Sequence, residues 1–321
     1  MNYYIGFDLG GTEIKVGVVD KDGNIIAKDS FTTPQDAETK DEFARIMADN
    51  GKRIVEKAGI NFDDVKGAGI GSAGLINPEK GRIELSVNIP ILSEFDLAPA
   101  VEKFLGKPTF LDNDVNAMTL GEFYYGAGKG YKHIIALTLG TGVGGGFIIN
   151  GHIYRGASFT AGEIGHISID PSGLYCPCGN YGCLERYVAR DGIITRFKTY
   201  MNQKRFPTKI NDYLENGEIT PKAISMAALD GDQLAIDVLA ETGKYLGIGL
   251  STLVNAFNPE LIIVGGGIAN AGDLILKPAE IEMRKRAYYI PVDAVKIVQA
   301  KFKNDAGIIG SAAVAFDRLT N

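Results

Sequence analysis

The sequence predicts an α/β protein with two domains. Short apolar segments typical of buried strands alternate along the chain with longer segments whose apolar residues recur at helical spacing. A strand, a glycine-rich turn and a returning strand follow one another in residues 3–19, and again in residues 134–149. This repetition indicates an internal duplication of architecture, and a length of 321 residues is sufficient for two domains.

The first part of the chain is expected to form a sheet with helices packed on it. Asp22-Gly23 is a hairpin signal between two of the strands. Phe43, Met47 and Ile54 lie at helical spacing, so residues 38–58 are predicted to form a helix. In chain order, the predicted strands are residues 3–8, 14–19, 24–32, 66–71 and 108–111, and the later helices are residues 97–105 and 115–125.

The second part is expected to be richer in helices. Its predicted strands are residues 134–139, the strand that returns after the following glycine turn, and residues 261–264. Its predicted helices are residues 184–200, 221–229 and 232–257, and a last helix that starts near Asp305. Residues 201–220 show the least pattern and are interpreted as a loop or an insertion.

The composition narrows the possible partners. Hydrophobic residues make up 45% of the chain and charged residues 22%, which is ordinary for a globular protein. The net charge of −6 and the lack of a basic stripe argue against a nucleic-acid partner. The chain shows no apolar run long enough to span a membrane and no signal-peptide pattern at its start. We therefore expect a cytoplasmic protein without a membrane partner.

All three cysteines of the chain, Cys176, Cys178 and Cys183, lie in one short loop, and His166 precedes them. Three thiolates and one imidazole are a ligand set that closes a tetrahedral structural zinc site. The alternative is a group of buried or redox-active thiols. Clustering in one loop disfavours scattered core thiols, and three cysteines leave one over after a disulfide forms. The sequence therefore predicts a structural zinc site made of these four residues.

Three glycine-rich turns that follow predicted strands are candidates for binding phosphate groups. Backbone N–H groups of glycines can approach an anion closely, and a carboxylate at a strand end can hold Mg²⁺ through water. The first turn contains Asp8, Gly10, Gly11, Thr12 and Lys15. The second contains Gly140, Thr141, Gly142 and Gly144, and the third, expected to open a helix, contains Gly265, Gly266 and Gly267.

A single turn of this kind is more often only a tight hairpin, because glycine is the usual residue of tight turns. Neither the Walker pattern nor the dinucleotide pattern occurs in its strand–turn–helix setting. Three such turns in one chain, the first headed by an aspartate, nevertheless predict a site for a nucleoside triphosphate.

These segments together resemble the ROK family, whose members are bacterial sugar kinases and related repressors. D-L-G-G-T-E-I-K is similar to the family's first phosphate motif, and L-G-T-G-V-G-G-G to its second. E-I-G-H and the cysteine loop resemble the family signature, and D-A-G-I-I-G-S-A near the C-terminus matches its closing helix. The resemblance covers essentially the whole chain and is greatest to the family's glucokinases.

The resemblance implies an actin-like, ribonuclease-H-like sugar-kinase fold of two α/β domains with an active-site cleft between them. The small domain is then residues 1–113 completed by the C-terminal helix 305–321, and the large domain is residues 114–304 with the zinc loop. The implied small molecules are ATP, Mg²⁺ and a hexose, and the implied assembly is a homodimer or homotetramer. The family's zinc ligands match His166, Cys176, Cys178 and Cys183.

The resemblance also assigns roles in the reaction. Asp114 matches the family's catalytic aspartate, which makes it the candidate general base. The alternative is that it only caps the following helix. The residues implied to bind the sugar are Asn88, Asn113, Asp114, Glu163, His166 and Glu185. Each glutamate can accept two hydroxyl hydrogen bonds, although a solvated surface carboxylate is its commoner role.

We therefore expect an ATP-dependent hexose kinase that phosphorylates the 6-hydroxyl of glucose. Ala73 and the segment N-I-P-I-L depart from the pattern of many members, so a kinase for fructose, mannose, N-acetylmannosamine or N-acetylglucosamine is the alternative. A repressor is disfavoured because the first strand begins at Tyr3, which leaves no room for a helix-turn-helix before it. A sugar sensor without catalysis is disfavoured because Asp8, Asp114 and the glycine loops are present.

Overall fold

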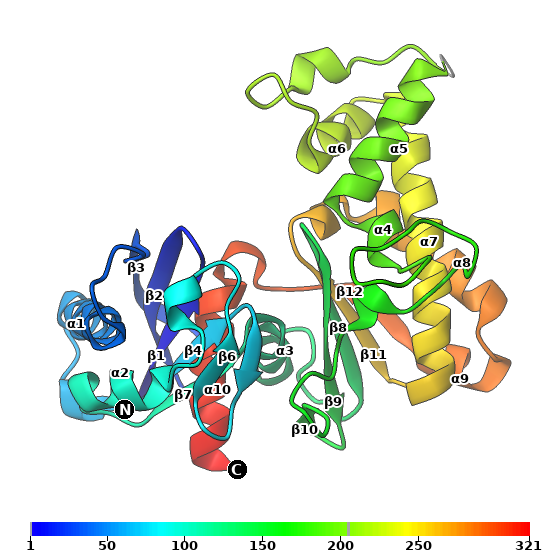
Figure 1. Cartoon of the computed structure of the whole chain (residues 1–321). Coiled ribbons are helices and arrows are strands. Elements are labelled where there is room, and N and C mark those ends of the chain that lie inside the picture. Colours follow the sequence, from blue (N-terminus) through cyan, green and yellow to red (C-terminus); the bar gives the residue numbers. More distant parts are fainter. Residues whose placement is uncertain (1, 204–205) are drawn as a thin grey trace. The chain divides into compact units, whose positions relative to one another are not determined.

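Two five-stranded sheets organise the chain (Figure 1). The computed structural model describes residues 2–203 and 206–321. The chain divides into two compact units: the first is Met1–Gly130, Gly146–Ala161 and Lys301–Asn321, and the second is Tyr131–Gly145 and Gly162–Ala300. The sequence suggests a domain boundary after residue 113, whereas the first compact unit continues to Gly130. The suggested boundary stays a prediction.

The first sheet combines an antiparallel meander with two parallel strands. Its strands are β1 (Tyr3–Leu9), β2 (Glu13–Asp20), β3 (Ile25–Thr32), β4 (Val65–Ser72) and β7 (Thr109–Asn113). Their order is β3-β2-β1-β4-β7; β1, β2 and β3 are antiparallel, whereas β4 is parallel to β1 and β7 to β4. The five strands predicted for this part of the chain are thus confirmed.

Helices cover both faces of the first sheet. They are α1 (Lys40–Lys57) and α2 (Leu97–Leu105) on one face, and α3 (Asp114–Tyr125) and α10 (Ala306–Thr320) on the other (Figure 1). Successive side chains of a strand point to opposite faces, so β1 contributes to two cores. Phe7 lies in the core with Phe43 and Met47 of α1, whereas Tyr4 lies in the core with Ile308 of α10.

Short elements connect these larger ones. β5 (Leu75–Asn77) and β6 (Arg82–Leu85) form a separate two-stranded antiparallel sheet. The 3₁₀ turns of the first unit are η1 (Phe62–Asp64), η2 (Pro90–Leu92) and η6 (Lys303–Asp305). The candidate site residue Asn88 lies between β6 and η2.

The second sheet is built around a fully buried parallel strand. Its strands are β8 (Ile134–Leu139), β9 (Val143–Ile149), β10 (His152–Tyr154), β11 (Leu261–Gly265) and β12 (Lys296–Gln299), in the order β10-β9-β8-β11-β12. All residues of β11 are buried, and β11 is parallel to both β8 and β12. The predicted succession of strand, glycine turn and returning strand is confirmed in β8 and β9.

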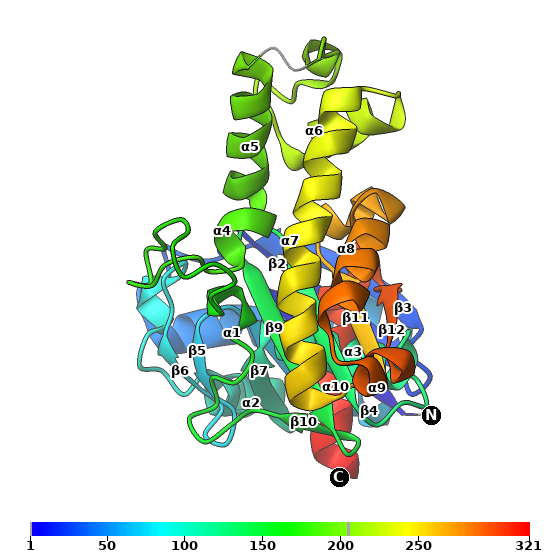
Figure 2. The ribbon, with the colours of Figure 1, turned by 90° about the vertical axis from the view of Figure 1, so that its right-hand side faces the viewer.

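Helices dominate the rest of the second unit. They are α4 (Glu185–Val188), α5 (Arg190–Asn202), α6 (Pro221–Leu229), α7 (Gln233–Phe257), α8 (Asp273–Arg286) and α9 (Tyr289–Ala294). The long helix α7 packs against α8 and α5, as Figure 2 shows. The 3₁₀ turns here are η3 (Ile164–His166), η4 (Ile210–Tyr213) and η5 (Ile268–Ala271).

Some predicted boundaries differ from the structure. The helix expected over residues 184–200 is divided at Ala189, whose backbone is extended, and the N–H of Arg190 donates a hydrogen bond to the carbonyl of Gly140 at 3.0 Å. The third glycine turn opens the short η5 and not an α-helix. Of the loop expected over residues 201–220, residues 204–205 lie outside the described part of the chain.

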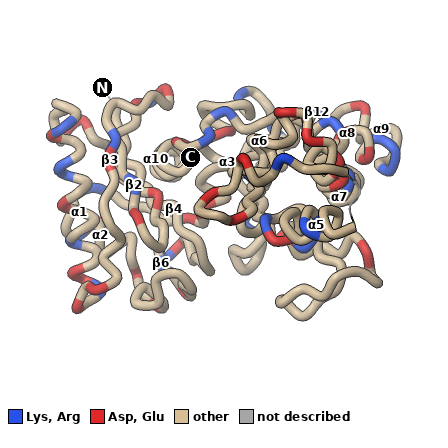
Figure 3. The backbone as a smooth tube through the Cα atoms, turned by 90° about the horizontal axis from the view of Figure 1, so that it is seen from above, with Lys and Arg blue, Asp and Glu red and all other residues tan. Residues whose placement is uncertain are grey.

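Basic and acidic residues are both distributed along the helices (Figure 3). On α8, for example, Lys277 pairs with Asp273 at 2.8 Å and Arg284 with Glu280 at 2.9 Å. Among the described residues, none of the helices combines the length and apolar character that crossing a membrane requires.

Helix α10 lies unusually close to the first sheet. A Cβ atom on Gly69 of β4 would lie 1.8 Å from the carbonyl oxygen of Ser311, which is closer than any real contact. We expect Gly69→Ala to lower the free energy of unfolding by about 1–3 kcal/mol or more, because the helix must shift away from the sheet. Thermal unfolding measures this effect. Gly267→Ala is the control, since no atom lies within 4 Å of its Cβ position, and equal melting temperatures for both variants would contradict the prediction.

Candidate functional site

The junction of β7 and α3 places Asp114 at the start of a helix. Asn113 caps this helix, because its Oδ1 accepts hydrogen bonds from the N–H groups of Val115 at 2.9 Å and Asn116 at 3.4 Å. The Asp114 side chain is exposed and accepts a hydrogen bond from the N–H of Val115 at 3.0 Å. The capping role therefore belongs to Asn113, which leaves Asp114 available for chemistry.

The surroundings of Asp114 raise the pKa of its carboxyl group. Burial by the surrounding protein is the main cause, the N–H of Val115 opposes it, and the negative charge of Asp8 adds to it. Water still reaches this carboxylate, because Asp114 is an exposed residue, so the protein removes only part of its hydration. A raised pKa makes the carboxylate a better proton acceptor, which suits a general base.

Asp8 is the second-last residue of β1 and lies next to Lys15 of β2, its direct partner in the strand register. The Nζ of Lys15 lies 4.0 Å from the Oδ2 of Asp8. Burial raises the pKa of Asp8, and the charge of Lys15 opposes this effect. A Cβ on Gly307 would lie 2.2 Å from Oδ2, so the first turn of α10 reaches this carboxylate only because that residue is glycine. Carboxylate oxygens are preferred Mg²⁺ ligands, so Asp8 fits the predicted ion-binding role.

The first glycine turn is held in place by residues that follow β3. The hydroxyl of Thr33 donates to the carbonyl of Gly10 at 2.7 Å, and the N–H of Thr33 donates to the carbonyl of Thr12 at 3.0 Å. The side-chain amide of Gln35 donates to the carbonyl of Gly11. Asn88 lies against the same turn, because a Cβ on Gly11 would be 3.2 Å from the Cβ of Asn88. The structure thus brings the predicted residues Gly10, Gly11, Thr12 and Asn88 together.

The four predicted metal ligands form one cluster. The ligand atoms of His166, Cys176, Cys178 and Cys183 all lie within 4.8 Å of one another, and all three cysteines are free. Cys178 Sγ is 3.6 Å from Cys183 Sγ, and Cys176 Sγ is 3.7 Å from His166 Nδ1. A tetrahedron around zinc with bonds of about 2.0–2.3 Å has edges of about 3.3–3.8 Å, so these residues fit a zinc ion.

The backbone of the cysteine loop requires glycine at its tight turn. Gly182 has a φ of 69°, and a Cβ there would lie 1.7 Å from the carbonyl oxygen of Asp170. The N–H of Ile169 donates to the carbonyl of Gly182 at 2.8 Å, so the two arms of the loop are held together beside the thiols. This geometry accounts for the glycines among the cysteines.

His166 presents its two ring nitrogens to different partners. Nδ1 lies on the side of Cys176, whereas Nε2 lies 4.0 Å from the Oε2 of Glu163. The side chains of both residues are partly open to solvent. An ion bound at Nδ1 would therefore fix the ring and leave Nε2 and the Glu163 carboxylate facing a ligand.

Glu185 connects the cysteine loop to the second glycine turn. It lies two residues after Cys183 and begins α4. Its Oε2 accepts a hydrogen bond from the N–H of Val143 at 3.0 Å, and a Cβ on Gly142 would be 2.6 Å from the same oxygen. The second carboxylate oxygen remains for another partner. Sequence reasoning placed Glu185 beside the metal loop but missed this contact.

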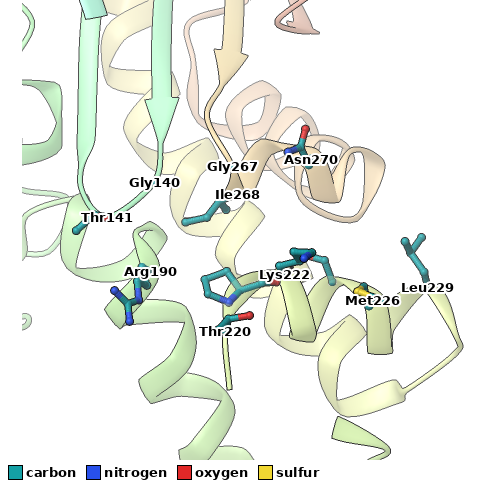
Figure 4. Close-up of a pocket in the computed structure, with 12 residues that line it drawn as sticks. Gly140, Thr141, Arg190, Thr220, Lys222, Met226, Leu229, Gly267, Ile268 and Asn270 are labelled. Carbon is teal, nitrogen blue, oxygen red and sulfur yellow. Dashed lines mark hydrogen bonds between the residues drawn. The ribbon is translucent and has the colours of Figure 1, made fainter. Parts of the chain in front are cut away.

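A cavity of about 550 Å³ lies beside the second and third glycine turns (Figure 4). The predicted residues Gly140, Thr141 and Gly267 line it. Gly142 and Gly266 belong to the same two turns, whereas Gly144 lies in β9 and Gly265 is the last residue of β11. The other lining residues are not predicted from the sequence. Arg190 comes from α5, Ile268 and Asn270 come from η5 beside Gly267, and the rest belong to α6 and its N-cap: Thr220, Pro221, Lys222, Ser225, Met226 and Leu229. The only local signal was the Thr220-Pro221 start of α6, which indicates a helix and not a ligand. The volume suits a small molecule.

Comparison with known proteins agrees with these features. The sequence model of the ROK family matches residues 4–318. The chain is 36% identical over 323 residues to a glucokinase of Streptomyces coelicolor, with 98% of each chain covered. It is 32% identical over 316 residues to a xylose repressor of Caldicellulosiruptor bescii, which covers 98% of this chain and 78% of the repressor. A crystal structure of a ROK family glucokinase from Streptomyces griseus, in complex with glucose and AMPPNP, is 34% identical with a TM-score of 0.78. It covers 98% of this chain and 99% of that chain.

Proposed function

The chain belongs to the ROK family and is a sugar kinase with that family's actin-like fold, and we propose that it phosphorylates the 6-hydroxyl of glucose with ATP. The observation that supports this proposal best is the orientation of His166. Its Nδ1 belongs to the thiol cluster and its Nε2 faces Glu163, so an imidazole and a carboxylate are presented together as hydrogen-bonding groups for sugar hydroxyls.

We assign the hexose contacts to the residues that the family resemblance implies: Asn88, Asn113, Asp114, Glu163, His166 and Glu185. Glucose is the sugar named for the Streptomyces griseus structure, and glucokinases are among the most similar relatives. This similarity favours glucose over the other hexoses.

Asp114 is proposed as the general base. As the 6-hydroxyl oxygen attacks the γ-phosphorus of ATP, the hydroxyl proton passes to the Asp114 carboxylate and the bond from the γ-phosphorus to the bridging oxygen of ADP breaks. Asn113 caps α3 directly beside this carboxylate and fixes the turn that carries it. Asp8 and Lys15, on the two strands that flank the first glycine turn, are proposed to act on the phosphates. Asp8 would hold Mg²⁺, which shields phosphate charge when bound.

The cavity beside Gly140, Thr141 and Gly267 is proposed to take the nucleoside part of ATP. The turns predicted to bind phosphates line part of this cavity, and Pro221, Met226 and Ile268 provide apolar surface in it. The flat nucleobase of ATP can pack against these apolar side chains while its phosphates accept hydrogen bonds from the glycine N–H groups.

We expect Ser225→Phe to raise the KM for ATP by about 10-fold or more, because a benzyl group would occupy the cavity that Ser225 lines. The KM for glucose should change little, since no proposed sugar contact is altered. Steady-state kinetics with each substrate varied in turn measures both constants. Ser225→Ala is the matched control, and an unchanged KM for ATP in the Phe variant would contradict the assignment of this cavity.

Zinc is the proposed ion of the cluster formed by His166 and the three cysteines. The ligand set and the distances between ligand atoms fit a structural zinc site. Its proposed role is to hold the loop and the His166 ring in place. We also propose that the protein assembles as a homodimer or homotetramer, as the family resemblance suggests.

A coupled assay of ADP release with ATP and Mg²⁺ across a panel of hexoses tests the function. We expect the highest kcat/KM with glucose. A preference for fructose, mannose, N-acetylmannosamine or N-acetylglucosamine would support the kinase reaction but change the assigned substrate. Binding of sugar without ADP release would instead indicate a sugar sensor, a possibility that the similarity to a repressor makes worth testing.

A further inference from the structure

An ion pair between a buried aspartate and a partly buried arginine lies next to the turn that carries Asp114. Asp112, the second-last residue of β7, is only 1% exposed, and its partner Arg155 follows β10. The Nε and Nη2 of Arg155 donate to Oδ2 of Asp112 at 2.8 Å and 2.6 Å. Neither residue belongs to the set proposed to touch sugar or ATP.

The other oxygen of the Asp112 carboxylate holds the turn itself. Its Oδ1 accepts hydrogen bonds from the N–H of Asn113 at 2.8 Å and from the Nδ2 of Asn116 at 3.0 Å. A carboxylate is planar, so two hydrogen bonds that fix Oδ2 also fix the direction of Oδ1. The Arg155 guanidinium therefore determines where the Asn113 backbone lies, and Asp114 is the next residue.

Removal of Arg155 alone would leave a buried anion without its cation. Asp112 has no other cationic partner among its described contacts, and an unpaired buried charge must gain water or a proton. Either change would turn the carboxylate away from Asn113 and Asn116, and the Asn113–Asp114 turn would lose one of its supports.

We propose that Arg155, acting through Asp112, is a positioning residue that holds Asp114 in the geometry for proton transfer. This inference rests on the proposed function, in which Asp114 is the general base. Displacement of a reacting group by about 1 Å can lower the rate about 100-fold, so a residue that touches no substrate can still control kcat. Arg155 lies far from the D-N-D segment in sequence, and the fold alone brings it to Asp112.

The test compares Arg155→Met and Arg155→Lys with the wild type in the full-length protein. We expect Arg155→Met to lower kcat about 10- to 100-fold while the KM for ATP changes less than about twofold. The kcat of Arg155→Lys should lie between those of the wild type and Arg155→Met, because lysine restores the charge but not the forked pair of donors. Near-ultraviolet circular dichroism at the assay temperature establishes that each variant is folded.

Arg196→Met is the matched control for the loss of a largely buried arginine side chain. Arg196 lies in the second unit with its side chain 10% exposed, and it donates to Thr242 at 2.8 Å and to the carbonyl of Tyr187 at 2.9 Å. Its variant should lose stability and keep the wild-type kcat. If Arg155→Met does not fold, the double variant Asp112→Asn/Arg155→Met removes the buried charge as well, and the same loss of kcat is expected of it.

A folded Arg155→Met or double variant with kcat within about twofold of the wild type overturns the positioning role. The same holds if Arg196→Met lowers kcat as much as Arg155→Met does. Asp114→Asn, assayed in parallel, separates this result from a failure of the proposed function. Retained turnover in Asp114→Asn overturns the assignment of the base, whereas lost turnover there with normal Arg155→Met kinetics overturns the positioning role alone.

Discussion

Replacement of Asp114 by Asn is expected to lower kcat for glucose phosphorylation by about 10²–10⁴-fold. The amide has nearly the shape of the carboxylate but cannot accept the hydroxyl proton. The helix cap remains, because Asn113 provides it, so the fold around the turn should be retained. Glucose binding should weaken little, since an amide oxygen can still accept a hydrogen bond from the 6-hydroxyl. Single-turnover kinetics together with calorimetric titration of glucose separate these two effects.

The pH dependence of the wild type gives a second measure of the same role. The base works only as a carboxylate, so turnover should be lost as the pH falls through the pKa of Asp114. Burial raises that pKa, so the acid limb of kcat/KM should lie at higher pH than an ordinary aspartate would give.

Asp96→Asn serves as the control for the substitution at Asp114, because Asp96 pairs with Arg82 at the surface of the same unit. Normal turnover in Asp114→Asn, or the same loss in Asp96→Asn, would remove Asp114 from its role.

Replacement of Cys178 by Ser is expected to remove most of the bound zinc and to raise the KM for glucose by about 10-fold or more. Without the ion, the His166 ring is free to rotate and the loop before Glu185 loses its anchor. Metal content by elemental analysis and KM for glucose by the coupled assay measure the two consequences.

Ser172→Ala, on the same loop but outside the cluster, is the control for changes in the loop itself. Removal of zinc from the wild type with a chelator should reproduce the effect of Cys178→Ser on glucose binding. A zinc-free protein that binds glucose normally would show that the cluster does not support the sugar site.

Much of the fold could be predicted because its signals are local. The strand β11 is a short apolar run, and the β8–β9 hairpin is marked by its glycines. The cysteine cluster was predicted because its ligands lie close in sequence as well as in space. Such features need no knowledge of distant contacts.

The features that were not predicted depend on contacts between distant segments. Helix α8 has only three buried residues, Ile275, Ala279 and Met283, and contains Pro278, so its helical pattern is weak and packing on α7 supports it. No sequence pattern marks Arg155, and its contact with Asp112 depends on the fold. Likewise, α6 joins the glycine turns in lining the cavity only in three dimensions.

The hydrogen bond between Glu185 and the N–H of Val143 implies reciprocal linkage between two ligands. Cys183 and Glu185 are separated by one residue, and Val143 begins β9 directly after residues 140–142 of the second glycine turn, which is proposed to hold ATP phosphates. An ion that orders the cysteine loop would also order the second glycine turn, because the Glu185 carboxylate links the two. Nucleotide and zinc should therefore strengthen each other's affinity by the same factor, so that a higher chelator concentration is needed to remove half of the metal when the protein is saturated with a non-hydrolysable ATP analogue.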